Sequence, residues 1–155
     1  LFRSREDDFA EIHPGGSLGR RLLQRVKDVM HSGEALPLVT AESPMSHVLA
    51  VMTCKEVRGA AGVIDEENGS LIGVITDGDI RRRLEKDENP LRDHVRELMS
   101  PHPKTIDCNE LAQKALFVMD QFDINLLFAV DKQSANPLRP VGILHIQDLL
   151  DAKIR

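Results

Sequence analysis

Two short motifs with an aspartate at the fourth position have the chemistry to hold a sugar and a phosphate. They are Thr76-Asp77-Gly78-Asp79 and His145-Ile146-Gln147-Asp148. The carboxylate of Asp79 can accept hydrogen bonds from both hydroxyls of a ribose, and the N-terminus of the helix expected to start there offers N–H groups and positive potential to a phosphate. Thr76 and Asp79 are also good helix-capping residues. The motif therefore predicts a nucleotide site, a helix cap, or both.

The second motif lacks the hydroxyl of the first, because His145 stands where Thr76 would be. An imidazole can stack on a ligand or donate a hydrogen bond to it, but a histidine at a surface position often has no such task. We therefore expect the site at Asp148 to bind a nucleotide less tightly than the site at Asp79.

Other candidate groups carry weaker signals. The run from Arg81 to Arg83 could neutralise phosphates, although charge runs are usually solvated helix faces. The stretch from Gly15 to Gly19 lacks the Gly-Lys-Ser/Thr end of a phosphate loop. Cys54 and Cys108 form no pair with metal-ligand spacing. The sequence thus predicts no metal site.

Composition narrows the classes of partner. The chain has 155 residues, a formal net charge of −5 and 3% aromatic residues, without Trp or Tyr. Nucleic-acid binders and proteins of anionic membranes usually present basic surfaces, so we expect neither partner. No apolar run reaches the ~18–20 residues of a membrane span, and the polar start does not resemble a signal peptide. These features predict a cytoplasmic protein fragment with an aliphatic core.

An internal repeat determines the expected fold. Five blocks recur in the same order, with offsets of 66 to 69 residues that change where loops are expected. The first copies of these blocks are Val29-Met30, Val48 to Met52, Val63 to Asp65, Gly73 to Ile75, and Asp79. Their second copies are Leu98-Met99, Ala115 to Met119, Ala129 to Asp131, Gly142 to Leu144, and Asp148.

Each copy shows a strand-helix-strand-strand-helix pattern. In the first copy the expected elements are an extended Leu38-Val39, a helix capped by Ser43 with Pro44 at its first position, strands at 60–64 and 71–76, and a helix from about Gly78. Asn68-Gly69 predicts a turn with positive φ. In the second copy Asn109 is the expected cap, with strands at 126–130 and 141–144. The fold class is α/β (α+β): two βαββα units at 26–89 and 90–155. Each unit is too small to be stable alone, so we expect one pseudo-symmetric body.

These units resemble a CBS domain pair, also called a Bateman module. The resemblance rests on Gly-Val-Ile-Thr-Asp-Gly-Asp-Ile-Arg in the first copy and Gly-Ile-Leu-His-Ile-Gln-Asp-Leu-Leu in the second. It implies clefts that bind adenine nucleotides or other ligands and regulate an attached enzyme, with Thr76, Asp79, His145 and Asp148 as the candidate contacts. It also implies association as a homodimer through the two pairs.

The segment before the repeats resembles the join between the catalytic and regulatory parts of arabinose-5-phosphate isomerases. It runs from Phe9 to Leu23 and includes His13-Pro14-Gly15-Gly16, and Thr76 to Arg82 also resembles that family. Residues 1–25 are then a linker and the remnant of a sugar isomerase (SIS) domain, which would be the missing partner of this chain in a tetrameric enzyme. In that enzyme His13 would serve the active site, where aldose–ketose isomerisation needs a general base.

Two classes of function follow from the resemblance. The first is a regulatory module that senses an adenine nucleotide or a CMP-sugar effector, with no cofactor required; it would belong to an isomerase that supplies lipopolysaccharide precursors or to another enzyme. The second is an assembly module whose clefts stay empty. The chain alone is expected to have no catalytic activity, since about 25 residues cannot form a catalytic domain.

Overall fold

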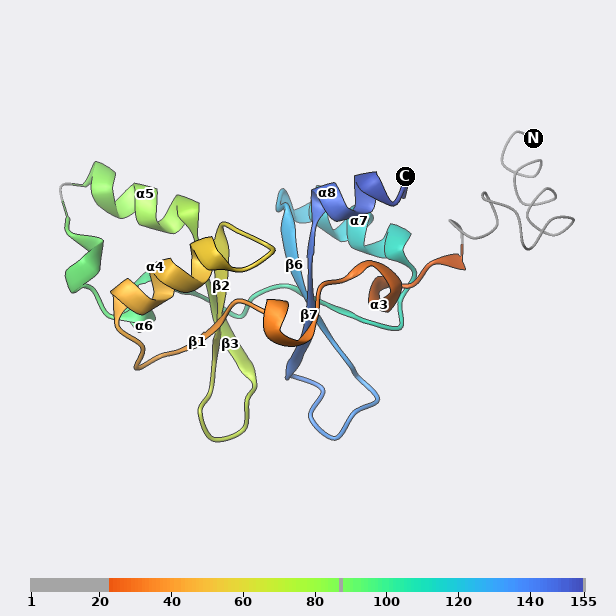
Figure 1. Ribbon diagram of the computed structural model, residues 1–155, viewed down its shortest axis with the longest axis horizontal. Helices are drawn as coiled ribbons and strands as arrows, with labels where there is room; N and C mark the ends of the chain where they lie inside the picture. The colour runs from red at the N-terminus through yellow and green to blue at the C-terminus, as the bar shows by residue number, and fades with distance from the viewer. Residues whose placement is uncertain (1–22, 87, 155) are drawn as a thin grey trace, which may run out of the picture.

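Two mixed sheets organise the computed structural model, which describes residues 23–86 and 88–154 (Figure 1). The first sheet has the order β1-β2-β3-β4, and the second has the order β5-β6-β7. In each sheet the first two strands are parallel and the next pair is antiparallel. The expected α/β class and the doubled βαββα order are confirmed.

The first sheet comprises β1 (Leu38–Thr40), β2 (Ala60–Ile64), β3 (Leu71–Thr76) and β4 (Ser100–Pro101), with helices α4 (Met45–Cys54) and α5 (Asp77–Glu85). The second comprises β5 (Thr105–Asp107), β6 (Leu126–Val130) and β7 (Pro140–His145), with helices α7 (Ala112–Phe122) and α8 (Ile146–Asp151). Four short helical elements precede the two copies: α3 (Val26–Val29), η1 (Gly33–Ala35), η2 (Pro90–Arg92) and α6 (Val95–Leu98).

The two predicted helix caps are wrong. α4 begins at Met45 after Pro44, because the Ser43 hydroxyl accepts a hydrogen bond from the Thr40 N–H at 3.0 Å instead of capping the helix. α7 begins at Ala112, two residues later than a cap at Asn109 requires. The Asn109 amide instead donates to Asp107 and Asp131. Both side chains form hydrogen bonds in the turns that precede the helices and do not cap the helices themselves.

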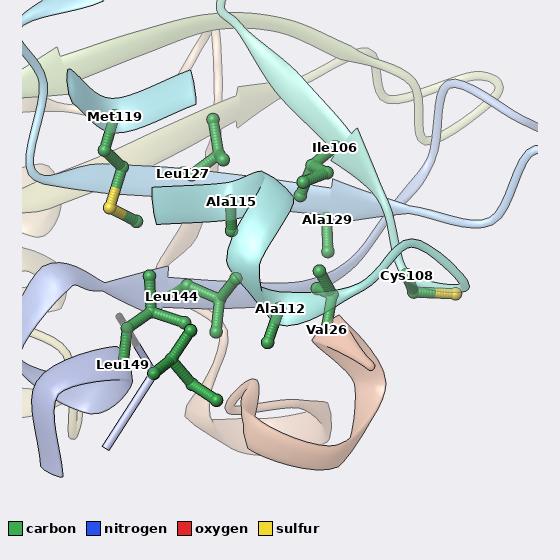
Figure 2. Packing of buried hydrophobic residues seen from close by; sticks show 11 residues of the cluster. Val26, Ile106, Cys108, Ala112, Ala115, Met119, Leu127, Ala129, Leu144 and Leu149 are labelled. Atoms are coloured by element: carbon green, nitrogen blue, oxygen red, sulfur yellow. The ribbon is translucent and has the colours of Figure 1, made fainter. Parts of the chain in front are cut away.

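The short helices α3 and α6 each pack on the sheet of the other copy. Val26 of α3 packs in the core beside the second sheet, together with Leu127, Leu144 and Leu149 (Figure 2). Val95 and Leu98 of α6 pack in the core beside the first sheet. Each sheet is therefore covered by a segment that precedes the other copy in the chain.

Two glycines permit this exchange. A Cβ on Gly142 would lie 2.2 Å from the Met30 sulfur, and a Cβ on Gly73 would lie 2.5 Å from the Met99 sulfur. Each methionine thus lies directly over a glycine of the sheet it covers. The recurrence of Met and Gly in the two copies therefore corresponds to one contact that is made twice in the structure.

A third core cluster joins the halves. Val57, Phe128 and Ile143 are buried, and apolar side chains of both sheets pack around them, including Leu38 and Leu126. The N–H of Leu71 also donates to the carbonyl of Leu138 at 2.9 Å. The expected packing of the two copies into one body is therefore present in the structure. Among the described residues, no helix has the length and apolarity needed to cross a bilayer.

Candidate functional site

A cleft with a volume of about 1390 Å³ lies between the two halves of the described chain. We call it the first cleft. One wall is the end of β3 and the start of α5, from Thr76 to Asp79. Residues of α7, the segment from Asp123 to Leu126 and the segment from Ser100 to Lys104 also line the cleft. The cleft therefore takes its lining from both copies.

Thr76 and Asp79 form a capping box at the start of α5. Asp79 Oδ2 accepts hydrogen bonds from the Thr76 N–H at 2.9 Å and from the Thr76 hydroxyl at 3.1 Å. Thr76 Oγ1 accepts from the Asp79 N–H at 3.3 Å. The capping alternative is thus real, and the same two residues line the first cleft.

The second carboxylate oxygen of Asp79 pairs with the exposed side chain of Arg82. Asp79 Oδ1 lies 2.5 Å from Nη2 of Arg82, one turn along the same helix. The Asp79 side chain is 11% exposed, whereas that of Arg82 is 66% exposed. An exposed arginine on a long side chain can leave this carboxylate at little cost, because surface ion pairs contribute ~0–1 kcal/mol. A ligand hydroxyl can then take its place.

Cationic and apolar side chains both line the first cleft. The basic residues are Arg58, Arg81, Arg82 and Lys104, and the acidic ones are Asp77, Asp79, Asp120 and Asp123. Apolar lining is supplied by Val74, Leu116, Phe117, Ile124, Leu126 and Phe128. Such a surface suits a ligand with a flat apolar part and an anionic part. In a typical ligand pocket the apolar side chains bury the ligand, and a small number of polar groups fix its orientation.

The three arginines of the predicted run have different surroundings. Arg81 and Arg82 are exposed and line the first cleft. Arg83 turns away and pairs with Glu88, Asp93 and Glu97 near α6. Two of the three are therefore both solvated and at the cleft, so the two alternatives were not exclusive.

The second cleft is smaller, at about 300 Å³, and lies beside α8. It is lined by His31, Glu56, Val57, Arg58, His145, Gln147 and Asp148. The structure thus brings the predicted pair His145 and Asp148 together. It adds His31 and Glu56, which the sequence did not point to.

His145 replaces threonine as a cap. Its Nδ1 accepts a hydrogen bond from the Gln147 N–H at 3.0 Å, and Asp148 Oδ2 accepts from the His145 N–H at 2.8 Å. The imidazole therefore has a structural role in the capping box of α8. A contact between His145 and a ligand stays a prediction.

His31 lies between two carboxylates in the second cleft. Its Nε2 is 2.9 Å from Asp148 Oδ1, and its Nδ1 is 2.8 Å from Glu56 Oε2. We call these three residues the His31 cluster. Partial burial lowers the pKa of the imidazole, but the hydrogen bonds and charges of Asp148 and Glu56 outweigh it and raise the pKa above its usual value. Because carboxylates only accept, the imidazolium, which donates from both nitrogens, fits this place.

A further group of ligand-type atoms lies outside both clefts. The side chains of Asp107, Cys108 and Asp131 approach within 4.8 Å of one another. The Asn109 amide already donates to both carboxylates, and burial raises the pKa of the Cys108 thiol. A cysteine binds a metal as the thiolate, and a raised pKa disfavours that form. We therefore attribute the proximity of these side chains to the hydrogen bonds with Asn109.

His13, the proposed catalytic residue, lies outside the described residues, as does most of the predicted linker at 1–25. The described residues of that segment reach Arg25, whose backbone forms an isolated bridge with Leu111.

Comparison with known proteins adds a family and a set of relatives. The family model for the CBS domain matches twice, at residues 26–86 and 95–155. An arabinose 5-phosphate isomerase of Pseudomonas aeruginosa is 43% identical over 96% of this chain and 44% of its own length. Its counterpart in Francisella tularensis is 33% identical over 97% of this chain and 44% of its own. The chain thus spans less than half the length of these relatives.

Solved structures share the fold. The CBS domain pair of protein MJ0100, in complex with 5′-methylthioadenosine and S-adenosyl-L-methionine, has a TM-score of 0.70 and 20% identity, covering 83% of this chain and 94% of that one. The protein CBSX2, in complex with AMP, has a TM-score of 0.66 and 23% identity, covering 83% and 95%.

Proposed function

This chain belongs to the CBS-domain family, and from that premise we propose that it is the regulatory module of an arabinose 5-phosphate isomerase whose first cleft binds a nucleotide. The parent enzyme would interconvert ribulose 5-phosphate and arabinose 5-phosphate for lipopolysaccharide precursors. Support for the parent comes from relatives named as that isomerase, which match nearly the whole of this chain. The parts of those relatives that this chain does not cover would then include the SIS domain.

The observation that carries the nucleotide proposal is the position of Asp79. Its carboxylate lines a cleft of about 1390 Å³ together with apolar side chains and four basic ones. A ribose diol would displace Arg82 from Asp79 Oδ1, and the released guanidinium would be free to pair with a phosphate. An adenine or cytosine base would lie against the apolar wall. An adenine nucleotide and a CMP-sugar both meet these requirements.

Relatives in fold support this class of ligand. Structures of CBS pairs in complex with AMP and with S-adenosyl-L-methionine adopt the same fold. At identities of 20% and 23% they do not identify the ligand of this chain. The residues at the cleft must therefore be tested directly.

A comparison of matched ligands tests the role of Asp79. We expect AMP, ATP or a CMP-sugar to raise the melting temperature of the chain, since a ligand of the native state stabilises it by mass action. The 2′-deoxy analogue of the active nucleotide should raise it less, because it offers Asp79 one hydroxyl instead of two. Equal shifts for the ribose and deoxyribose forms would contradict recognition of the diol, and no shift with any nucleotide would contradict the proposed function.

Exposed apolar side chains favour an assembly function as the second candidate. Leu84 on α5 is 58% exposed, and Leu150 on α8 is 46% exposed. α5 and α8 lie along the same edge of the molecule (Figure 1). A homodimer through these helices would cover the apolar side chains and could position catalytic domains in a tetramer. The oligomeric state of the chain, measured without ligand, tests this candidate.

A further inference from the structure

We propose that His31 determines which cleft is used, because it occupies the carboxylate of the second cleft and thereby restricts the nucleotide to the first. This inference rests on the proposed function and adds a specificity-determining residue to it.

Strand pairing defines the equivalent of His31. Ser100 pairs with Val74 of β3, and His31 pairs with Ile143 of β7. Both pairs are related by the same offset of 69 residues, from 74 to 143 and from 31 to 100. Met30 and Met99, the preceding residues, also make equivalent contacts with Gly142 and Gly73. Ser100 therefore holds, at the first cleft, the place that His31 holds at the second.

Asp79 and Asp148 have the same partner type at one carboxylate oxygen and different partners at the other. In both, Oδ2 accepts from the backbone N–H three residues earlier, at 2.9 Å for Asp79 and 2.8 Å for Asp148. The remaining oxygen of Asp79 meets the exposed Arg82, whereas that of Asp148 meets His31, whose side chain is 26% exposed. The oxygen that a ribose would use is thus held by an exposed arginine at the first cleft and by a half-buried histidine at the second.

His31 is held more firmly than Arg82. The His31 side chain is 26% exposed, and its second ring nitrogen pairs with Glu56, which follows α4 and orients the ring toward Asp148. Arg58 and His145 are the other ionisable groups that line this cleft. Displacement would leave the half-buried imidazolium of His31 without this carboxylate, whereas a displaced Arg82, 66% exposed, stays solvated, so the exchange costs more at the second cleft. His31 lines this cleft, whose volume is about 300 Å³ against about 1390 Å³ for the first.

The test counts binding sites in variants of the whole chain. Wild-type protein and His31→Ser, which installs the residue found at the equivalent position, are titrated with AMP, ATP and CMP by calorimetry. We expect one equivalent of nucleotide for wild type and two for His31→Ser. The second equivalent should disappear in His31→Ser/Asp148→Ala. His47→Ser, at an exposed position on α4, is the matched control and should bind one equivalent.

Folding is monitored by the melting temperature of each variant without ligand. If His31→Ser is not folded under the titration conditions, Glu56→Gln gives the answer, because it changes an exposed side chain and leaves His31 with one carboxylate. Glu56→Gln should then show a second, weaker binding event.

The outcomes separate this inference from the proposed function. One equivalent in both wild type and folded His31→Ser, lost in Asp79→Ala, overturns the role of His31 and leaves nucleotide binding at the first cleft intact. Two equivalent sites in wild type also overturn it. No binding by any variant contradicts the proposed function, and the inference falls with it.

Discussion

His31 Nε2 lies 2.9 Å from Asp148 Oδ1, although the two residues are 117 positions apart in the chain. The contact joins the segment that leads into the first copy to the last helix of the second. It exists because α3 and the residues after it pack on the second sheet, where His31 pairs with Ile143. A polar contact of this kind makes stability depend on pH.

Substitution of His31 with Ser should destabilise the fold more at low pH than at high pH. Burial lowers the pKa of His31 in the folded state, but the hydrogen bonds and charges of Asp148 and Glu56 together outweigh it and raise this pKa. A raised pKa means that the folded state binds the proton more tightly, so the stabilisation is complete below the unfolded value of about 6.5 and is lost as pH rises through the folded value. Urea unfolding at a series of pH values measures the difference between wild type and variant. A difference in free energy that does not change with pH would show that His31 does not form this ion pair.

Replacing Gly142 with Ala should destabilise the protein by about 1–3 kcal/mol, the usual cost of overpacking a core. The added Cβ would meet the sulfur, Cγ and Cβ of Met30, so rotation of the methionine tip does not remove the clash. Gly78→Ala is the control, because its nearest contacts are ordinary and alanine favours the helix. Thermal or urea unfolding of both variants decides the matter, and a loss for Gly78→Ala as large as that for Gly142→Ala would refute the explanation.

The repeats could be predicted because their strands are buried apolar runs and their offsets change only at loops. The start of the first helix in each copy could not be predicted, because Ser43 and Asn109 have side chains that suit a turn as well as a cap, and both form hydrogen bonds within turns. Periodicity in the sequence also carries no information about which copy a segment covers. The exchange of α3 and α6 therefore required the structure.

The candidate sites show the same division. Thr76, Asp79, His145 and Asp148 lie at helix starts in clefts, where the strand-helix pattern put them. His31 and Glu56 lie at 25 positions from each other and follow no periodic pattern. The signal that could have found His31 is its place after Met30, since Ser100 follows Met99 at the offset of 69.

Introducing charge on the exposed helix surface should disrupt a dimer. Leu84→Glu and Leu150→Glu place carboxylates where the proposed homodimer would bury leucines of α5 and α8. Burial of an unpaired charge is strongly unfavourable, so sedimentation should show a monomer for both variants and a dimer for wild type. Leu138→Glu is the control: Leu138 is 63% exposed in the loop between β6 and β7, away from α5 and α8 (Figure 1). A wild-type monomer, or a dimer in all variants, would contradict assembly through these helices.

Nucleotide affinity should depend on Asp79 far more than on Asp148. Asp79→Ala removes a charged acceptor for the ribose hydroxyls, a type of hydrogen bond that contributes about 1.5–3 kcal/mol, so the affinity should fall on the order of tenfold to a hundredfold. Asp148→Ala should change the affinity little, because Asp148 is paired with His31 and its cleft is expected to be empty. Titration calorimetry measures both.

The control concerns stability, since each aspartate also belongs to the capping box of its helix. Both replacements remove equivalent caps, and Asp148→Ala also removes the contact with His31, so it should lower the melting temperature without ligand at least as much as Asp79→Ala. A loss of affinity specific to Asp79→Ala then reports ligand contact rather than helix fraying. Equal losses of affinity from both replacements would mean that the nucleotide is sensed through the stability of the fold, and a loss confined to Asp148→Ala would assign the ligand to the second cleft.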